Sequence, residues 1–158
     1  MASNYQQVCE NGHKITGQYS MRPQDQQRFC RKCGANTIIA CPNCDEKIQG
    51  DRFERRGSRL ELVESPDVPS YCPNCGQPFP WTKKKIQTAI QIFSEFGDLN
   101  AEEKKTIEQD VENIAKDVPE AELSARRIKR IWERGKSVGY EVIMEFASRT
   151  AANILKGP

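Results

Sequence analysis

The chain has 158 residues, of which 37% are hydrophobic, and 24 basic residues stand against 22 acidic ones. Mean hydropathy is −0.74. No run of about 18 apolar residues is present, which argues against a membrane-spanning helix, and the balanced charge argues against a globally basic nucleic-acid-binding domain. The length allows one domain or two small ones. Residues 1–7 lack the basic-then-apolar pattern of a signal peptide, so we expect a cytoplasmic protein with reduced thiols.

Eight potential metal ligands lie within the first 75 residues, and they comprise every cysteine and the only histidine. Eight such ligands in short pairs complete two tetrahedral zinc sites. Seven cysteines would leave one stranded in a disulfide framework, and a redox C-x-x-C requires one pair on a thioredoxin-like sheet. The sequence therefore predicts two structural zinc ions. The ligand pairs are Cys9 and His13, Cys30 and Cys33, Cys41 and Cys44, and Cys72 and Cys75.

Residues 1–82 are predicted to form a double zinc-ribbon domain built from short β-hairpins. In sequential pairing each ion takes two consecutive pairs; in a cross-brace the first pair joins the third and the second joins the fourth. The strand-like link between Cys33 and Cys41 favours sequential pairing. Strands are expected near 14–17, 37–40 and 60–63, with a polar loop over 18–27.

Two features of this half bear on the metal. Phe79 and Trp81 are expected to cover the second metal site or the joint to the following segment. Zinc also changes the charge, because a site of three thiolates and one imidazole carries −1 and a four-thiolate site −2. From the formal +2 of the chain, the metal-loaded protein is therefore expected near −1, unlike a basic nucleic-acid binder.

The composition changes after Trp81, where proline becomes rare and Glu, Lys, Ile and Ala predominate. Residues 83–158 are predicted to form a helical domain of about three helices, which gives the chain an α+β fold class. Thr82 is expected to cap the first helix and Gly97 to end it, and Asn100 with Glu103 resembles a capping box. The core positions expected for the first two helices are Ile86, Ala89, Ile90, Phe93, Phe96, Ile107, Val111, Ile114 and Val118.

The third helical segment holds one apolar face from Leu123 to Ile154, as a long helix kinked near 135–139 or as two helices. Its last part should project or need a partner, since it is longer than the two helices before it. We expect a homodimer that covers apolar residues such as Val142, Ile143, Phe146 and Ile154. The alternative is that the segment folds back onto its own neighbours.

Six cations between residues 126 and 136 form a basic stretch on this segment. We favour the interpretation that they pair with acidic residues of the same half, such as Glu122 four residues before Arg126. The alternative is an acidic partner, which includes nucleic acid and anionic lipid. The candidate partner-binding residues are Arg126, Arg127, Arg130, Trp132, Arg134 and Phe146.

The motif Cys-Pro-Asn-Cys, repeated later as Tyr-Cys-Pro-Asn-Cys-Gly-Gln-Pro-Phe-Pro-Trp-Thr before a helical tail, resembles an uncharacterised bacterial family of zinc-ribbon proteins. The family is known as a domain of unknown function. The similarity runs from the Cys-Glu-Asn-Gly-His motif at 9–13 to Thr82, and more loosely through residues 126–129 to the C-terminus. It implies a bacterial intracellular protein with tandem ribbons, and no known chemistry.

These features predict a non-enzymatic zinc protein that acts as a protein-interaction or adaptor module, with the helical tail used for docking or self-assembly. Both predicted sites use four protein ligands, and the only histidine is one of them, so no imidazole remains as a general base. One alternative is a nucleic-acid-binding regulator using basic residues such as Arg28, Arg31 and the Arg52–Arg59 loop with Phe53. Another is peripheral membrane association through the C-terminal amphipathic helix.

Overall fold

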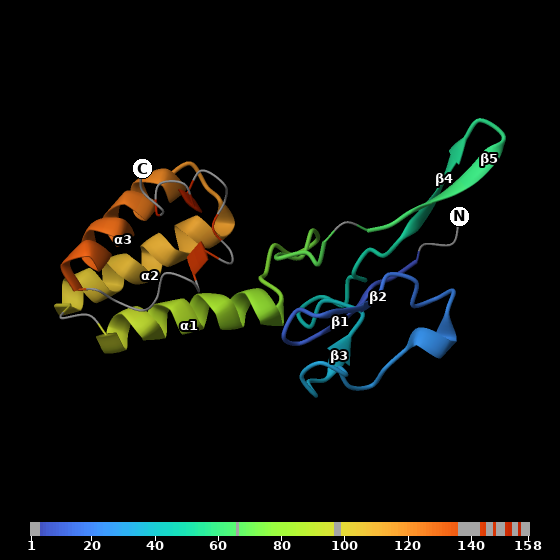
Figure 1. Cartoon of the computed structure of the whole chain (residues 1–158), viewed down its shortest axis with the longest axis horizontal. Helices are drawn as coiled ribbons and strands as arrows, with labels where there is room; N and C mark the ends of the chain where they lie inside the picture. Colours follow the sequence, from blue (N-terminus) through green and yellow to red (C-terminus); the bar gives the residue numbers. More distant parts are fainter. Residues whose placement is uncertain are drawn as a thin grey trace. The chain divides into compact units, whose positions relative to one another are not determined.

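The computed structural model describes residues 4–65, 67–96, 99–135, 143–144, 147, 151–152 and 155, without the side chains of Phe96, Trp132 and Arg134. Short strands precede three helices, which confirms the predicted α+β class (Figure 1). The chain divides into two compact units, Met1–Lys83 and Lys84–Pro158, here called the ribbon unit and the helical unit. No helix in the described part is both long and apolar enough to cross a membrane.

The ribbon unit contains a three-stranded antiparallel sheet in the order β2–β1–β3. The strands are β1 (Gln7–Cys9), β2 (Lys14–Thr16) and β3 (Thr37–Ile38). The central strand β1 is buried along its whole length, and Val8 faces Lys14 on one side and Ile38 on the other. The strands expected near 14–17 and 37–40 are therefore present, and the loop over 18–27 contains one 3₁₀ turn, η1 (Pro23–Asp25).

The segment that enters β1 pairs with the second ribbon before it joins the first. The Gln6 N–H donates to the Ile48 carbonyl at 2.8 Å, and the Gly50 N–H donates to the Asn4 carbonyl at 2.9 Å. Four residues further on, Val8 lies in the sheet of the first ribbon. One extended stretch thus holds both ribbons in register.

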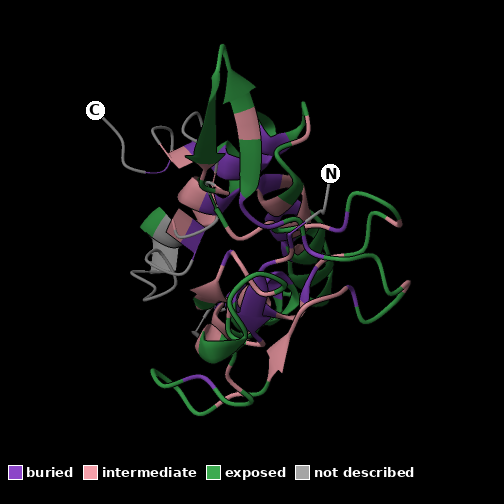
Figure 2. Ribbon diagram, turned by 90° about the vertical axis from the view of Figure 1, so that its right-hand side faces the viewer, coloured by how far each residue is buried: buried purple, intermediate pink, exposed green. Residues whose placement is uncertain are grey.

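A second antiparallel pair, β4 (Arg52–Arg56) and β5 (Arg59–Val63), projects from the second ribbon (Figure 1). Strand β5 covers the strand expected near 60–63, whereas β4 was not predicted. A two-residue turn joins them, and its first residue Gly57 has φ +65°, as a type II′ hairpin turn requires at that position. Figure 2 shows that most of this hairpin is exposed.

A buried carboxylate lies at the base of this hairpin. Asp51 Oδ1 accepts hydrogen bonds from the Ser65 N–H at 2.8 Å and the Ser65 hydroxyl at 3.1 Å, and Oδ2 accepts from Gln18 Nε2 at 3.1 Å. Lys14 Nζ lies 3.6 Å from Oδ1. Burial raises the pKa of Asp51, but the donors and Lys14 outweigh it and hold the pKa below its usual value. Asp51 therefore ties the hairpin to the first ribbon.

The hydrophobic core of the ribbon unit is small and includes metal-ligand side chains. Phe79 and Trp81 stack with ring centroids 4.8 Å apart, and they pack in one cluster with Val8, Ile48, Cys41 and Cys72. Trp81 Cβ also lies so close to Gly12 that an added methyl group there would be 3.1 Å away. The two aromatic residues thus cover the second ligand group, as expected, and Trp81 also contacts the turn of the first.

The helical unit contains most of α1 (Pro80–Phe96), with α2 (Ala101–Lys116) and α3 (Ala121–Gly135). Helix α1 begins at Pro80, so the expectation that Thr82 caps it is wrong; Thr82 lies buried in the first turn. A proline as first helical residue explains the earlier start, because its missing N–H would be unpaired there anyway. Helix α1 ends at Phe96, next to Gly97.

The predicted capping box at the start of α2 is confirmed. Asn100 Oδ1 accepts from the N–H groups of Glu102 at 3.0 Å and Glu103 at 2.9 Å, and Glu103 Oε2 accepts from the Asn100 N–H at 3.1 Å. This arrangement satisfies N–H groups that have no partner within the helix. Val118, expected on the stripe of α2, lies beyond the helix end and is only half-buried.

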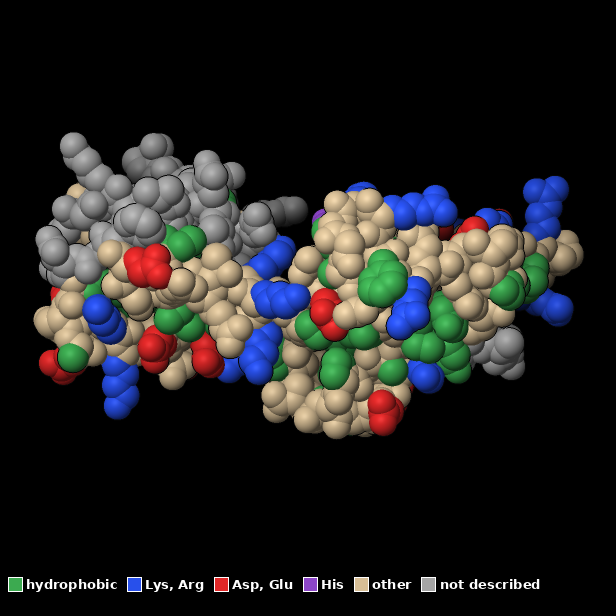
Figure 3. All heavy atoms as spheres, turned by 90° about the horizontal axis from the view of Figure 1, so that it is seen from below, with side chains coloured by type: hydrophobic (Ala, Val, Ile, Leu, Met, Phe, Trp, Pro, Cys, Tyr) green, Lys and Arg blue, Asp and Glu red, His purple; other side chains and the backbone are tan. Residues whose placement is uncertain are grey.

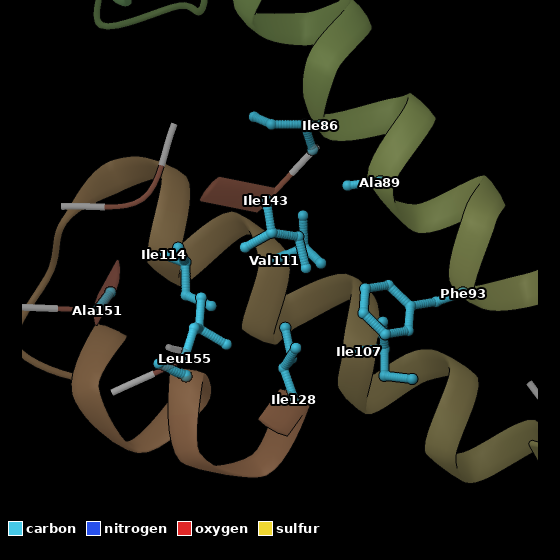
Figure 4. Close-up of a cluster of buried hydrophobic side chains, with 11 residues drawn as sticks. Ile86, Ala89, Phe93, Ile107, Val111, Ile114, Ile128, Ile143, Ala151 and Leu155 are labelled. Carbon is cyan, nitrogen blue, oxygen red and sulfur yellow. The ribbon is translucent and has the colours of Figure 1, made fainter. Parts of the chain in front are cut away.

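The core of the helical unit joins the three helices to residues near the C-terminus. Figure 4 shows that Ile86 and Phe93 of α1 point toward the same cluster as Val111 of α2 and Ile128 of α3. All residues of this core come from the helical unit, so the two units have separate cores. Its buried members are Ile86, Ala89, Phe93, Ile107, Val111, Ile114, Ala125, Ile128, Ile143, Ala151 and Leu155.

The C-terminal segment differs from the expectation of one apolar face available to a partner. Ile143, Ala151 and Leu155 are buried in the core of the helical unit. The expectation that Ile143 needs an external partner is therefore wrong, because other helices of the same unit cover it. The expected kink at 135–139 and the apolar residues Val142, Phe146 and Ile154 fall outside the described residues. Dimerisation through them stays a prediction.

Gly50 offers a test of the junction between the ribbons. A Cβ there would overlap the carbonyl oxygen of Gly17 and the carbonyl carbon of Tyr5, and backbone atoms cannot rotate away. We expect Gly50→Ala to destabilise the zinc-loaded ribbon unit by about 3 kcal/mol or more, as measured by urea unfolding. The control is Gly34→Ala, where φ is +71° but no atom lies within 4 Å, with an expected cost of about 1–2 kcal/mol. Equal costs would contradict a tight backbone contact at Gly50.

Candidate metal centres

The three C-x-x-C pairs share one local backbone structure. The N–H of the first cysteine donates to the carbonyl five residues later, as from Cys72 to Gln77 at 2.9 Å, and its own carbonyl accepts from the N–H four residues later, as from Gly76 at 2.9 Å. The residue after the second cysteine has a positive φ, which is +71° at Gly34, +57° at Asp45 and +69° at Gly76. Each turn therefore points two sulfurs toward one point.

The first ligand group consists of Cys9, His13, Cys30 and Cys33, whose ligand atoms all lie within 4.8 Å of one another. His13 Nδ1 lies 3.4 Å from Cys9 Sγ and 3.6 Å from Cys30 Sγ. Cys9 Sγ lies 3.8 Å from Cys33 Sγ. Gly12, with φ +85°, turns the chain so that Cys9 and His13 face the same point.

The second ligand group consists of Cys41, Cys44, Cys72 and Cys75, and its sulfurs also lie within 4.8 Å of one another. Cys41 Sγ is 3.8 Å from Cys75 Sγ, and Cys44 Sγ is 3.6 Å from Cys72 Sγ. Each group joins two pairs that are consecutive in the sequence. This is the sequential pairing that the link between Cys33 and Cys41 favoured, and it excludes the cross-brace.

Both groups fit a tetrahedral zinc ion. Zn–S bonds of about 2.3 Å put two thiolates about 3.8 Å apart, and a Zn–N bond of about 2.0 Å puts nitrogen about 3.5 Å from each sulfur. The observed spacings of 3.6–3.8 Å and 3.4–3.6 Å match these values. They are far longer than the S–S bond of about 2.05 Å in a disulfide. The chain thus has two four-ligand sites of the kind that holds structural zinc.

Backbone N–H groups lower the pKa of some of the ligand thiols and so favour the thiolate form that binds a metal. The Ala35 N–H lowers the pKa of Cys33 to about 6, and the Gln77 N–H does the same for Cys75. The Glu46 N–H acts on Cys44 in the same sense, but burial and the neighbouring sulfurs outweigh it and raise the pKa to about 11. Without metal, the pKa of Cys44 therefore lies above that of Cys75 in the same site. Bound zinc requires the thiolate form, so metal binding releases the protons that the thiols still hold.

Asparagine side chains lie beside these sulfurs, and each of them contacts a cysteine of the other turn in the same site. In the four-cysteine site, Asn74 Nδ2 donates to Cys44 Sγ at 3.6 Å, and Asn43 donates to Cys75 Sγ. Each Cys-Pro-Asn-Cys turn therefore supplies a hydrogen bond to the second cysteine of the other turn. Such bonds offset part of the excess negative charge of a four-thiolate site and fix the ligand orientation.

The first site lacks this reciprocity. Asn11 Nδ2 donates to Cys33 Sγ at 3.4 Å, but Lys32 occupies the position in the facing turn that corresponds to Asn43. Cys33 is also the one ligand of the eight that is exposed. The two sites therefore differ in charge, in solvent access and in the hydrogen bonds around the sulfurs.

The candidate partner-binding residues on α3 are in part engaged within the chain. Arg126 Nη2 donates to Glu122 Oε1 at 2.9 Å, the pair that the spacing predicted. Arg127 Nη1 donates at 3.3 Å to Asp110 Oδ1, a buried carboxylate that also accepts from the Ser124 hydroxyl. Arg130 is exposed. The side chains of Trp132 and Arg134, and the whole of Phe146, fall outside the described part.

All eight ligands were predictable from the sequence. The hydrogen bonds from asparagine to the sulfurs, here called the asparagine bridges, and the contacts of Asp51 with Gln18, Lys14 and Ser65, here called the Asp51 junction, were not predicted. The sequence does contain a pattern that indicates the bridges, because both Cys-Pro-Asn-Cys turns have asparagine directly before the second cysteine. The Asp51 junction brings together residues up to 51 positions apart in the chain, and no local pattern indicates it.

Metal content provides the direct test of both sites. Protein purified without chelator should contain two zinc ions per chain by elemental analysis. Cys41→Ser should unfold the ribbon unit, because zinc binding supplies much of its folding free energy. The helical signal in far-UV circular dichroism should survive, since the helical unit has its own core. One ion or none with intact thiols would refute the ligand assignment, and loss of both units together would refute separate cores.

The asparagine bridges predict a difference in metal release. Asn43→Ala and Asn74→Ala should each speed zinc transfer from the four-cysteine site to a chromogenic chelator, by about 10-fold or more. We expect a faster phase from the first site, where Cys33 is exposed, and a slower phase from the four-cysteine site. Only the slower phase should change. Asn36→Ala, at an exposed asparagine outside the ligand turns, serves as the control. Rates unchanged from the parent chain would show that the bridges do not retain the metal.

Comparison with known proteins places the chain in a family but gives it no characterised relative. No curated protein and no solved structure matches it. Residues 2–155 match a family described as "Uncharacterized protein conserved in bacteria", and this agrees with the resemblance carried by the ligand turns. The chain belongs to this bacterial family, DUF2321, and carries two zinc-ribbon ligand sites within it.

Proposed function

We propose that the chain is a non-enzymatic zinc protein whose ribbon unit serves as a rigid platform for binding another protein. The main support for this proposal is that protein ligands fill all four coordination positions at both sites. Each site has four protein ligands at tetrahedral spacing, whereas a catalytic zinc keeps one position for water or substrate. The only histidine is among the ligands, so the chain has no imidazole left for proton transfer.

The metal fixes the backbone at both ends of each turn. A small unit held this way presents its surface residues in one conformation, which reduces the entropy lost on binding. The helical unit is proposed to act as a second docking or assembly element. Its exposed residues on α3 include Leu123 and Arg130.

A nucleic-acid-binding function is the second candidate, because basic and aromatic residues are exposed together near the first site. The Arg28 guanidinium lies 5.3 Å from the centre of the exposed Phe29 ring. Arg31 and Lys32 follow in the next turn and are exposed. Aromatic residues and cations in this arrangement can stack on bases and contact phosphates.

One experiment separates these functions. The zinc-loaded full chain and Cys41→Ser should be compared for saturable binding to proteins captured from a bacterial lysate and then purified. We expect a protein partner that binds the loaded chain and is lost with the ribbon fold. Arg28→Ala with Arg31→Ala should leave this binding unchanged. Binding of a mixed-sequence DNA or RNA oligonucleotide, with affinity that falls steeply with salt and depends on Arg28 and Arg31, would instead support the second candidate.

An enzyme would contradict both candidates. If the zinc-loaded chain turns over a substrate and a substitution outside the eight ligands abolishes turnover with the fold intact, the non-enzymatic proposal fails.

A further inference from the structure

The β4–β5 hairpin, residues 52–63 and here called the arm, exposes its apolar side chains. Leu60 is 64% exposed, Leu62 40% and Phe53 38%. Phe53 lies opposite Leu62 and Arg55 opposite Leu60 in the antiparallel register. Residues opposite each other share one face of a hairpin, so these four side chains form a single face that is mainly apolar.

The other face of the arm is charged and mostly paired within itself. Arg52 Nε lies 2.7 Å from Glu54 Oε1, and Arg56 Nε lies 3.6 Å from Glu61 Oε2. These pairs neutralise one another in part. Arg55, on the apolar face, has no ion pair among the described residues. The arm therefore combines a charged face that is largely satisfied with an apolar face that carries one available cation.

A hollow runs beside β4. Four consecutive residues of the strand, Arg52–Arg55, line it together with Tyr5, Lys47 and Gln49. Successive side chains of a strand point to opposite faces, so a hollow bounded by four in a row follows the strand edge. In the two-stranded sheet this edge of β4 pairs with no other described strand.

Further apolar and basic groups surround the hollow. Met21, which is 51% exposed, reaches it from the loop of the first ribbon. Lys47 Nζ lies 5.9 Å from the centre of the Tyr5 ring, and Lys47 lines the hollow together with Arg55. Figure 3 shows hydrophobic and basic side chains next to each other at the end of the ribbon unit that carries the arm. The lining also contains Glu46, Asp51 and Glu54, of which Asp51 is paired with Lys14 and Glu54 with Arg52. Beside the apolar surface, an occupant of the hollow would therefore meet the cations of Lys47 and Arg55 and the carboxylate of Glu46.

The charge of the arm contrasts with that of the metal-loaded chain. The arm contains four arginines and two glutamates, while two bound zinc ions with their ligands bring the whole chain near −1. The arm by itself is thus net positive, and Arg55 is its arginine that lines the hollow without an ion pair among the described residues. Charge complementarity calls for an acidic occupant there.

We propose that the arm and the hollow along β4 form a docking site for an extended segment of another protein, in which acidic residues alternate with apolar ones. The segment adds to the open edge of β4 through backbone hydrogen bonds. Its apolar side chains pack on Phe53, Leu60 and Met21, and its carboxylates lie near Arg55 and Lys47. This site rests on the proposed function and gives the chemistry of the partner.

A nucleic acid fits the arm less well than a peptide does. Leu60 and Leu62 are aliphatic, and bases stack on aromatic rings and guanidinium groups rather than on leucine. Glu54 and Glu61 lie opposite each other on the charged face, where they would repel phosphates. Arg52 and Arg56 are already paired with these glutamates.

The test uses a library of random twelve-residue peptides displayed on phage and selected on the zinc-loaded full chain. We expect the selected peptides to alternate Asp or Glu with apolar residues, and a labelled synthetic copy to bind with micromolar affinity. Leu60→Ser and Arg55→Glu should each weaken that binding about 10-fold or more. A proline in the centre of the peptide should abolish binding, because it removes a backbone donor.

Matched surface changes serve as controls. Leu123→Ser alters another exposed leucine, on α3, and Arg31→Glu reverses an exposed cation outside the arm; both should leave the affinity unchanged. Each variant must retain two zinc ions and the parent circular dichroism spectrum. The double variant Phe53→Ser with Leu62→Ser repeats the test if Leu60→Ser lowers zinc content.

Each alternative outcome overturns the proposal. Selected peptides without an acidic and apolar pattern, or with affinity unaffected by arm variants, exclude this docking site. Salt-dependent binding of an oligonucleotide that Arg55→Glu abolishes assigns the arm to nucleic acid. Sedimentation that changes from dimer to monomer on Leu60→Ser assigns it to a second copy of the chain. A protein partner that binds normally to the arm variants leaves the proposed function standing and removes only this site.

Discussion

The ribbon unit depends on metal–thiolate bonding more than on any hydrophobic contact. Its buried cluster holds six residues, of which two are ligand cysteines, and its strands are two to five residues long. A core of that size does not offset the conformational entropy of about 80 residues. Zinc binding at the two tetrahedral sites supplies the remaining folding free energy, and it does so only when the cysteine thiols are deprotonated and correctly placed. The hydrogen-bonded turns with their positive-φ residues provide that placement.

The helical unit follows a different principle. Its core draws apolar residues from all three helices and from the described part of the C-terminal segment, and no metal ligand contributes to it. Polar contacts also join the helices. Asp110 of α2 accepts a hydrogen bond from the Ser124 hydroxyl of α3 at 2.7 Å. Because Arg127 and Arg126 pair with acids of the same unit, part of the basic stretch on α3 stabilises the unit. Each unit thus has its own source of stability.

Local chemistry explains which features could be predicted from the sequence. Cysteine and histidine at ligand spacing have few other uses, so the eight ligands and their sequential pairing were predictable, and so was the box of Asn100 and Glu103. Strand β4 was missed because Arg-Phe-Glu-Arg-Arg has no apolar alternation. It forms through pairing with β5 and the turn at Gly57, which are tertiary effects that outweigh propensity. Periodicity marked Ile143 as apolar but could not say which surface would cover it.

The position of the arm in the chain follows from the metal. The arm is inserted between the two ligand pairs of the second site, and Cys44 and Cys72, whose sulfurs lie 3.6 Å apart, hold the ends of the insertion together. Lengthening a loop whose ends are already joined costs little additional free energy. The fold therefore places few demands on the exposed side chains of the arm, apart from the turn at Gly57 and the junction at Asp51. Apolar side chains such as Leu60 contribute little to the stability of the ribbon unit while they remain in water. An exposed apolar strand edge favours aggregation, and the proposed docking site would cover these side chains when it is occupied.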